Sequence, residues 1–72
     1  MAIHYKVDVL SKLKEAGYST YKLRTDKIMG EATIQKIRKG DNISWENIST
    51  ICGLLNCQIG DILEYVAEKN NN

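Results

Sequence analysis

The chain has 72 residues, of which 43% are apolar and none is proline, and its formal net charge is +1. No apolar run approaches the roughly 18 residues that cross a bilayer, and two cysteines are too few for a disulfide framework. We therefore expect a cytoplasmic protein with reduced thiols. A chain this short forms one domain at most, predicted over residues 1–69, with a disordered tail at residues 70–72.

The spacing of the apolar residues predicts an all-α fold of five helices. Isoleucines and leucines recur three and four positions apart, as on the inner face of a helix, and runs with strand signals do not stand out. In chain order, the helices are predicted over residues 5–16, 20–27, 31–39, 45–55 and 59–67. The start of the first helix is the least defined, because residues 4–8 carry no clear N-cap.

Capping residues define most of these boundaries. Four candidate N-caps are each flanked by apolar residues five positions apart, which is the spacing of a hydrophobic staple. They are Ser19 (Tyr18 with Leu23), Gly30 (Met29 with Ile34), Ser44 (Ile43 with Ile48) and Gln58 (Cys57 with Ile62). Three residues suited to the left-handed conformation that closes a helix are Gly17, Gly40 and Asn56.

Apolar stripes at spacings of three and four predict the buried faces. The candidate core residues are Leu10 and Leu13 in the first helix, Ile48, Ile51, Cys52 and Leu55 in the fourth, and Ile59, Ile62, Leu63 and Val66 in the fifth. Trp45 opens the fourth helix and is expected to cover part of this core.

The charged residues are unevenly distributed along the chain. Residues 22–40 carry six basic and two acidic side chains, a net charge of +4, whereas residues 41–72 carry a net charge of −4. A basic segment in a nearly neutral protein indicates one anion-facing surface. A merely solvated basic segment is an equally good explanation on charge alone.

The second and third predicted helices form the most informative segment, between Ser19 and Gly40. Only residues 28–30 separate them, so they cannot lie antiparallel and are expected to cross at a large angle, as in a helix-turn-helix. With Ile34 and Ile37 facing inward, four side chains gather within about 50° of the opposite direction. These are Ala32, Gln35, Lys36 and Lys39.

The chemistry of this outward face suits the major groove of DNA. Glutamine pairs with adenine through two hydrogen bonds, lysine reaches guanine O6 and N7, and alanine contacts the thymine methyl group. We predict base contacts from Ala32, Gln35 and Lys36, the alternative being a merely solvated face. Glu31 either accepts from a cytosine amino group or is only a first-turn acid favoured by the helix dipole.

Phosphate contacts are predicted at two places beside this face. The first turn of the second helix offers free N–H groups next to hydroxyls, and the end of the third helix with its following loop is expected to hold the opposite strand. The predicted residues are Ser19, Thr20, Tyr21 and Lys22 at the first place, and Lys39 and Asn42 at the second. Ser19 serves as the helix cap in either case.

The chain resembles the Cro/phage-repressor type of helix-turn-helix, the XRE family of bacterial regulators. The residues that carry the resemblance are STYKL (19–23), Met29 and TIQKIRKG (33–40), while ICGLLNCQIGDILEY (51–65) is similar to small stand-alone regulators of Gram-positive bacteria and their mobile elements. The resemblance covers about residues 8–66 and implies a compact five-helix repressor-like domain. It places the base-reading positions on Glu31, Ala32, Gln35 and Lys36, and phosphate contacts on Thr20 and Lys39.

Three residues depart from the family pattern inside the motif. Arg24 stands where the family has a small residue, which implies a looser approach of the two helices or an outward side chain. Ile28 replaces the turn glycine, which implies a turn without a positive φ there. Arg38 replaces an acid that often orients a basic residue of the second helix.

Enzymatic, cofactor and metal sites are not predicted. His4 is the single histidine, and no nucleophile–base pair stands out. Cys52 and Cys57 supply, with His4, fewer than the four ligands of a structural zinc site. We interpret both cysteines as small buried hydrophobic residues.

The sequence therefore predicts a bacterial transcriptional regulator, with a repressor role preferred, that binds double-stranded DNA sequence-specifically. A monomer of this size spans only a few base pairs, so we expect a homodimer on DNA, joined through the fifth helix or the C-terminus. The alternative function is a protein-interaction module of the same helical fold, using the acidic C-terminal third and Tyr65.

Overall fold

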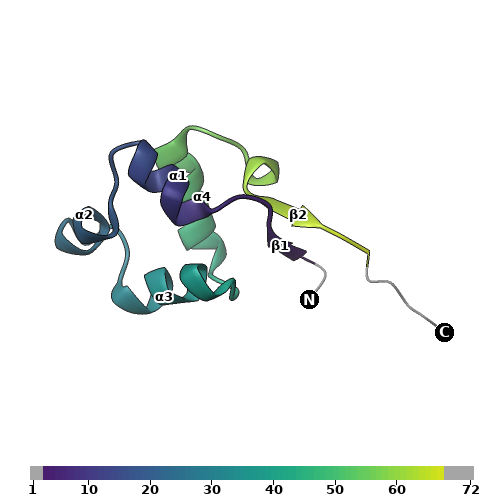
Figure 1. Cartoon of the computed structure of the whole chain (residues 1–72), viewed down its shortest axis with the longest axis horizontal. Coiled ribbons are helices and arrows are strands. Elements are labelled where there is room, and N and C mark those ends of the chain that lie inside the picture. Colours follow the sequence, from purple (N-terminus) through teal and green to yellow (C-terminus); the bar gives the residue numbers. More distant parts are fainter. Residues whose placement is uncertain (1–2, 68–72) are drawn as a thin grey trace.

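A computed structural model describes residues 3–67 of the chain. In chain order, these residues form β1 (Ile3–Tyr5), α1 (Val9–Glu15), α2 (Thr20–Thr25), α3 (Glu31–Lys39), α4 (Trp45–Leu55), a 3-10 helix, η1 (Ile59–Asp61), and β2 (Leu63–Tyr65). The ribbon of β1 and β2 projects from one end of the helical body, and α2 lies at the other end (Figure 1). The fold is predominantly helical, as predicted, and no helix in residues 3–67 is long and apolar enough to cross a membrane.

Capping hydrogen bonds fix the starts of the helices. The Ser19 hydroxyl accepts from the Lys22 amide at 3.2 Å, and the Ser44 hydroxyl accepts from the Asn47 amide at 3.1 Å. Gly30 is the N-cap of α3, and Gln58 is the N-cap of η1. All four predicted N-caps are confirmed, and α3 and α4 have the predicted bounds.

The first helix begins later than residue 5, where the prediction placed it. Asp8 is its N-cap, because the Asp8 carboxylate accepts from the Ser11 amide at 3.2 Å and α1 starts at Val9. Aspartate is a favoured cap, but the flanking Val7 and Lys12 are not the apolar pair of a staple. The boundary therefore lacked the pattern that identified the other four.

Left-handed residues end the helices. Gly17, Gly40 and Asn56 have φ values of 98°, 81° and 53°, as predicted. Lys27 has a φ of 57°, and α2 ends at Thr25, two residues before its predicted end. Ile28 itself needs no positive φ, as expected, because the reversal falls one residue earlier.

The prediction of a fifth helix over residues 59–67 is wrong. This segment forms η1 and then β2, which pairs antiparallel with β1 in the register Ile3 with Tyr65, His4 with Glu64 and Tyr5 with Leu63. The four apolar residues have helical spacing, but Ile59 is 56% exposed whereas Ile62 is 2% exposed. Short apolar runs do not distinguish a helix from a strand, and here the pairing partner lies some sixty residues away.

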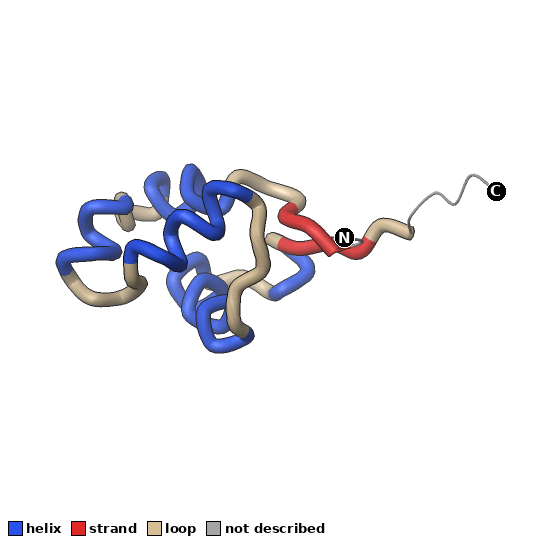
Figure 2. The backbone as a smooth tube through the Cα atoms, turned by 90° about the horizontal axis from the view of Figure 1, so that it is seen from below, coloured by secondary structure: helices blue, strands red, loops and turns tan. Residues whose placement is uncertain are grey.

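The core lies between the helices. Its buried members are Val9, Leu13, Leu23, Met29, Ile34, Ile37, Ile51 and Ile62. Trp45 is 88% exposed, so the prediction that it covers the core is wrong. The view of Figure 2 shows the two strands continuing away from the helices. The predicted tail at residues 70–72 lies outside the described residues.

Candidate nucleic-acid interface

The third helix presents the outward face that its spacing predicts. Ile34 and Ile37 are buried, whereas Ala32 and Lys36 are exposed and Gln35 is half-buried. Burial of the two isoleucines fixes the rotation of α3 about its axis, because a half-turn would place both in water. The polar face of α3 is therefore held toward solvent by the core.

Glu31 is tied to residues on either side of it. Its Oε1 accepts a hydrogen bond from Arg24 Nη1 at 3.0 Å, and its Oε2 accepts one from Gln35 Nε2 at 2.6 Å. The Gln35 hydrogen bond, followed by the Arg24 guanidinium, lowers the pKa of Glu31. The carboxylate is thus ionised at neutral pH and holds two side chains of the candidate interface in place.

This arrangement leaves Gln35 with hydrogen-bonding capacity. A primary amide has two N–H donors and one carbonyl acceptor, and Gln35 uses one donor on Glu31. Within residues 3–67 its second donor and its carbonyl oxygen have no other partner, and these two groups are the pair that adenine recognition requires. The carboxylate defines which end of the amide faces it, because only the amide nitrogen can donate.

Arg24 is a residue of this site that sequence reasoning did not assign. It was noted only as a departure from the family pattern, with an outward side chain as one interpretation. The structure shows that side chain 42% exposed and reaching across the turn to Glu31. In the sequence, a basic residue of α2 precedes an acidic residue at the start of α3 by seven positions. This spacing indicates a contact only once the geometry of the turn between the helices is known.

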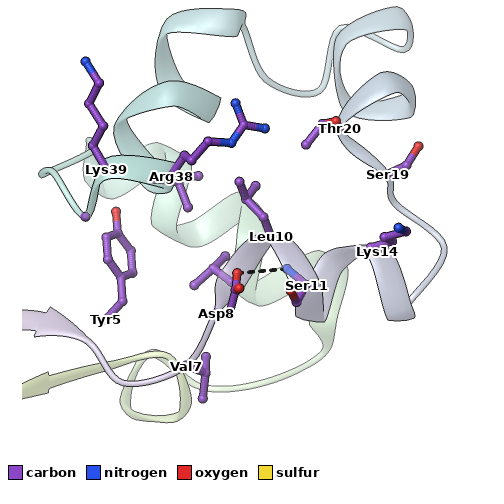
Figure 3. Close-up of a pocket in the computed structure, with 13 residues that line it drawn as sticks. Tyr5, Val7, Asp8, Leu10, Ser11, Lys14, Ser19, Thr20, Arg38 and Lys39 are labelled. Carbon is purple, nitrogen blue, oxygen red and sulfur yellow. Dashed lines mark hydrogen bonds between the residues drawn. The ribbon is translucent and has the colours of Figure 1, made fainter.

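The residues predicted to hold phosphates do not form one group. Ser19, Thr20 and Lys39 line the same pocket, between α1 and the ends of α2 and α3 (Figure 3). Asn42 lines a different groove, beside the ribbon. Lys39 and Asn42, which we predicted to hold the opposite strand, thus line two different hollows, both of which include Gly40.

The other two predicted phosphate residues lie outside both hollows. Tyr21 is 69% exposed on α2. Lys22 forms an ion pair with Asp26 at 3.2 Å, and both side chains are about half exposed. Solvent-exposed pairs of this kind are weak, so Lys22 remains available to an anion.

The pocket of Figure 3 also contains two cations that were not predicted, Lys14 and Arg38. Arg38 was singled out in the sequence only as a departure. Nothing in the sequence of α1 distinguishes Lys14 from its neighbours. Both residues line this pocket because α1 packs against α3.

The two cysteines are half-buried against the core, as small hydrophobic residues. Burial, followed by the neighbouring Cys52, raises the pKa of the Cys57 thiol, which makes it a poor nucleophile at neutral pH. Among residues 3–67, no group of three or more histidine, cysteine or acidic side chains is placed to hold a metal ion.

Comparison with known proteins identifies the family. The chain matches the Cro/C1-type HTH DNA-binding domain over residues 9–68. The comparisons with curated proteins and with solved structures gave no match. The matched residues run from α1 to beyond β2, and they include α2, α3 and the polar face described above. The chain therefore belongs to the family of Cro/C1-type HTH DNA-binding domains.

Proposed function

We propose that the protein is a cytoplasmic bacterial transcriptional repressor that binds double-stranded DNA sequence-specifically. In this proposal α2 and α3 are the helix-turn-helix, and α3 enters the major groove. The observation that carries it is the exposed polar face of α3, opposite Ile34 and Ile37, in a chain of a DNA-binding family. Occupation of an operator is sufficient to block transcription, which favours the repressor role.

The base contacts follow from the side chains of that face. Gln35 pairs with adenine, Lys36 donates to guanine O6 and N7, and Ala32 contacts a thymine methyl group. Glu31 holds the Gln35 amide in the orientation that this pairing needs. A carboxylate has more acceptor positions than these two hydrogen bonds occupy, so Glu31 also has the capacity to accept from a cytosine amino group.

The backbone contacts flank the reading face. We propose Ser19, Thr20, Tyr21 and Lys22 on one side of α3, with Lys39 and Asn42 completing the set. Such contacts set register and orientation, and they carry no sequence information of their own. When a phosphate binds, Lys22 either leaves its weak ion pair with Asp26 or contacts both groups.

We further propose that the protein binds as a homodimer, joined at the ribbon end. The fifth helix, which the sequence offered as an interface, is absent from residues 59–65. Exposed apolar side chains instead surround the groove beside the ribbon: Ile3, Trp45, Ile59 and Tyr65. Analytical ultracentrifugation with and without an operator tests this state, and a monomer on an operator of any length contradicts it.

The test of DNA binding is a salt titration of affinity for a labelled duplex. With six phosphate contacts, affinity falls by about a thousandfold between 50 and 200 mM salt. A salt-independent affinity contradicts the proposed backbone contacts. The absence of affinity for any duplex at low salt contradicts DNA binding itself and leaves the protein-interaction module as the function of this fold.

A further inference from the structure

The two oxygens of the Glu31 carboxylate have different partners. Oε1 accepts from Arg24 Nη1 at 3.0 Å, across the turn from α2, and Oε2 accepts from Gln35 Nε2 at 2.6 Å, about one turn further along α3. Arg24 therefore bears on the orientation of the carboxylate, and the carboxylate bears on the orientation of the Gln35 amide. A residue of α2 is linked in this way to a side chain of the outward face of α3.

The backbone on both sides of this link is fixed by the core. Leu23, next to Arg24, is fully buried, and its carbonyl oxygen accepts from the amides of Ile28 and Met29 at 2.9 and 3.2 Å. These hydrogen bonds define the course of the chain between α2 and α3, and the buried side chain of Ile34 defines the rotation of α3. The fold therefore holds the two partners of the link at a defined separation.

The charges around α2 leave Arg24 to this carboxylate. Lys22 pairs with Asp26, the C-cap of α2, at 3.2 Å, so the acid nearest to Arg24 in the sequence already has a partner. The side chains of Arg24 and Glu31 are 42% and 53% exposed. Pairs exposed to this extent contribute little to stability, so the main consequence of the contact is the position of the carboxylate.

A Gln35 amide held in this way matches one purine and not the other. With one N–H on Glu31, the amide presents its second N–H and its carbonyl oxygen. Adenine offers the acceptor N7 and the donor N6–H₂ in the major groove, whereas guanine offers two acceptors, N7 and O6. A guanine would therefore meet the amide carbonyl with an acceptor of its own. A released amide can instead turn both N–H groups toward guanine.

From this arrangement we infer that Arg24 is a positioning residue which, through Glu31, makes Gln35 select adenine over guanine, an inference that rests on the proposed function of α3 as the reading helix. Arg24 holds Oε1, and this contact keeps Oε2 directed at the amide. The amide keeps one N–H on that oxygen while its other two groups pair with the base. Without Arg24 the carboxylate is free to rotate, and the amide is free to present both N–H groups.

The experiment compares two duplexes by anisotropy. One is an operator selected from random DNA, and the other has guanine in place of adenine at the position where Gln35→Ala loses its preference. In Arg24→Met the preference for adenine over guanine should fall by at least about fivefold. Lys12→Met is the matched control, because it removes the same charge from an exposed position of α1 and should keep the preference of the unaltered protein.

A double variant tests the route through Gln35. In the Gln35→Ala background there is no amide to position, so Arg24→Met should leave the ratio of the two affinities unchanged. A merely structural role of Arg24 would lower both affinities together and leave their ratio intact in either background. Thermal unfolding shows that each variant is folded at the temperature of the titration.

Four results overturn the inference. They are an unchanged preference in Arg24→Met, an equal fall in Lys12→Met, a fall that persists in the Gln35→Ala background, and an operator without any adenine that responds to Gln35→Ala. If the unaltered protein binds no duplex, it is the proposed function that fails, and NMR of the free protein then tests the link itself. A shift of the Gln35 side-chain amide signals in Arg24→Met, absent in Lys12→Met, supports the positioning role, and unchanged signals overturn it.

Discussion

The guanidinium of Arg24 donates a 3.0 Å hydrogen bond to the carboxylate of Glu31, joining α2 to the first residue of α3. The family has a small residue at the position of Arg24, where two helices approach. The structure accommodates the larger side chain by directing it outward along the surface, with its charge in water and its stem on the protein. The substitution thereby supplies a link across the turn instead of separating the helices.

This link makes a prediction about the ionisation of Glu31. Its pKa is lowered first by the hydrogen bond from Gln35 and then by Arg24. Gln35→Ala and Arg24→Met should therefore each raise the pKa of Glu31 toward its ordinary value. Carbon-13 NMR of the carboxyl group during a pH titration measures both changes. A Glu31 pKa that is the same in all three proteins contradicts the network.

The same shift sets the direction of a pH effect on stability. Because the pKa is lower in the folded state, ionised Glu31 stabilises the fold above its unfolded pKa, and this contribution is lost as the pH falls through the folded value. Glu31→Gln should therefore remove part of the acid dependence of unfolding while leaving the neutral-to-basic range flat. Urea unfolding at a series of pH values checks this, and an unchanged acid dependence would be the contrary result.

Lys27 is a lysine in the left-handed region, where a side chain is strained. Lys27→Gly should stabilise the protein by about 0.5–1 kcal/mol, the relief of strain exceeding the entropy that glycine adds to the unfolded chain. Ile28→Gly is the matched control, since it removes a half-buried side chain packed on the core and should destabilise. Thermal unfolding distinguishes them. Destabilisation by Lys27→Gly would contradict the turn described here.

Ser19 and Ser44 form a matched pair of helix caps. Their hydroxyls accept amide hydrogen bonds of 3.2 and 3.1 Å, so alanine at either position should cost about 1 kcal/mol of stability. Of the two serines, only Ser19 lines the pocket of Figure 3, which Lys14 and Arg38 also line. Ser19→Ala should therefore weaken duplex binding under conditions where both variants are folded, and Ser44→Ala should not. If Ser19→Ala and Ser44→Ala bind the duplex with equal affinity in an anisotropy titration, Ser19 serves only as a helix cap.

Because Trp45 is exposed, replacing it should affect dimerisation and not the stability of the monomer. Trp45→Ala should change the free energy of unfolding of the monomer by no more than about 0.5 kcal/mol, as at other surface positions. Ile51→Ala, in the core, should cost about 2–5 kcal/mol. If the ribbon end is the dimer interface, Trp45→Ala weakens dimerisation measured by sedimentation. A dimer unaffected by the loss of this indole places the interface elsewhere.

The parts of the fold that the sequence predicted are those with local signals at both ends. Helices α3 and α4 each carry an N-cap with a staple and a left-handed closing residue, so their bounds match the structure. The ribbon escaped prediction because its pairing joins the two ends of the chain, and no local pattern encodes a partner some sixty residues away. The apolar residues of this segment keep helical spacing, which concealed the change from helix to strand. They are Ile59, Ile62, Leu63 and Val66.

The candidate site also has one part that the sequence predicts and another that only the packing of the helices defines. The outward face of α3 follows from helical geometry alone, because the positions of Ile34 and Ile37 determine which residues point outward. The Arg24–Glu31 contact and the pocket around Arg38 both depend on how two or three helices pack. Arg24 and Arg38 appeared in the sequence only as exceptions to a family pattern, and the structure shows where their side chains lie.

The measurement that tests the central claim most directly is selection of bound sequences from a random DNA pool, for the unaltered protein and for Lys36→Ala and Lys39→Ala. The proposed function predicts a recovered palindrome for the unaltered protein, as expected for a dimer on two half-sites. Lys36→Ala should relax the preference at one position of each half-site, whereas Lys39→Ala should weaken all sites alike. Equal and uniform losses from both variants would contradict α3 as the reading helix, and a pool without enrichment would contradict sequence-specific binding.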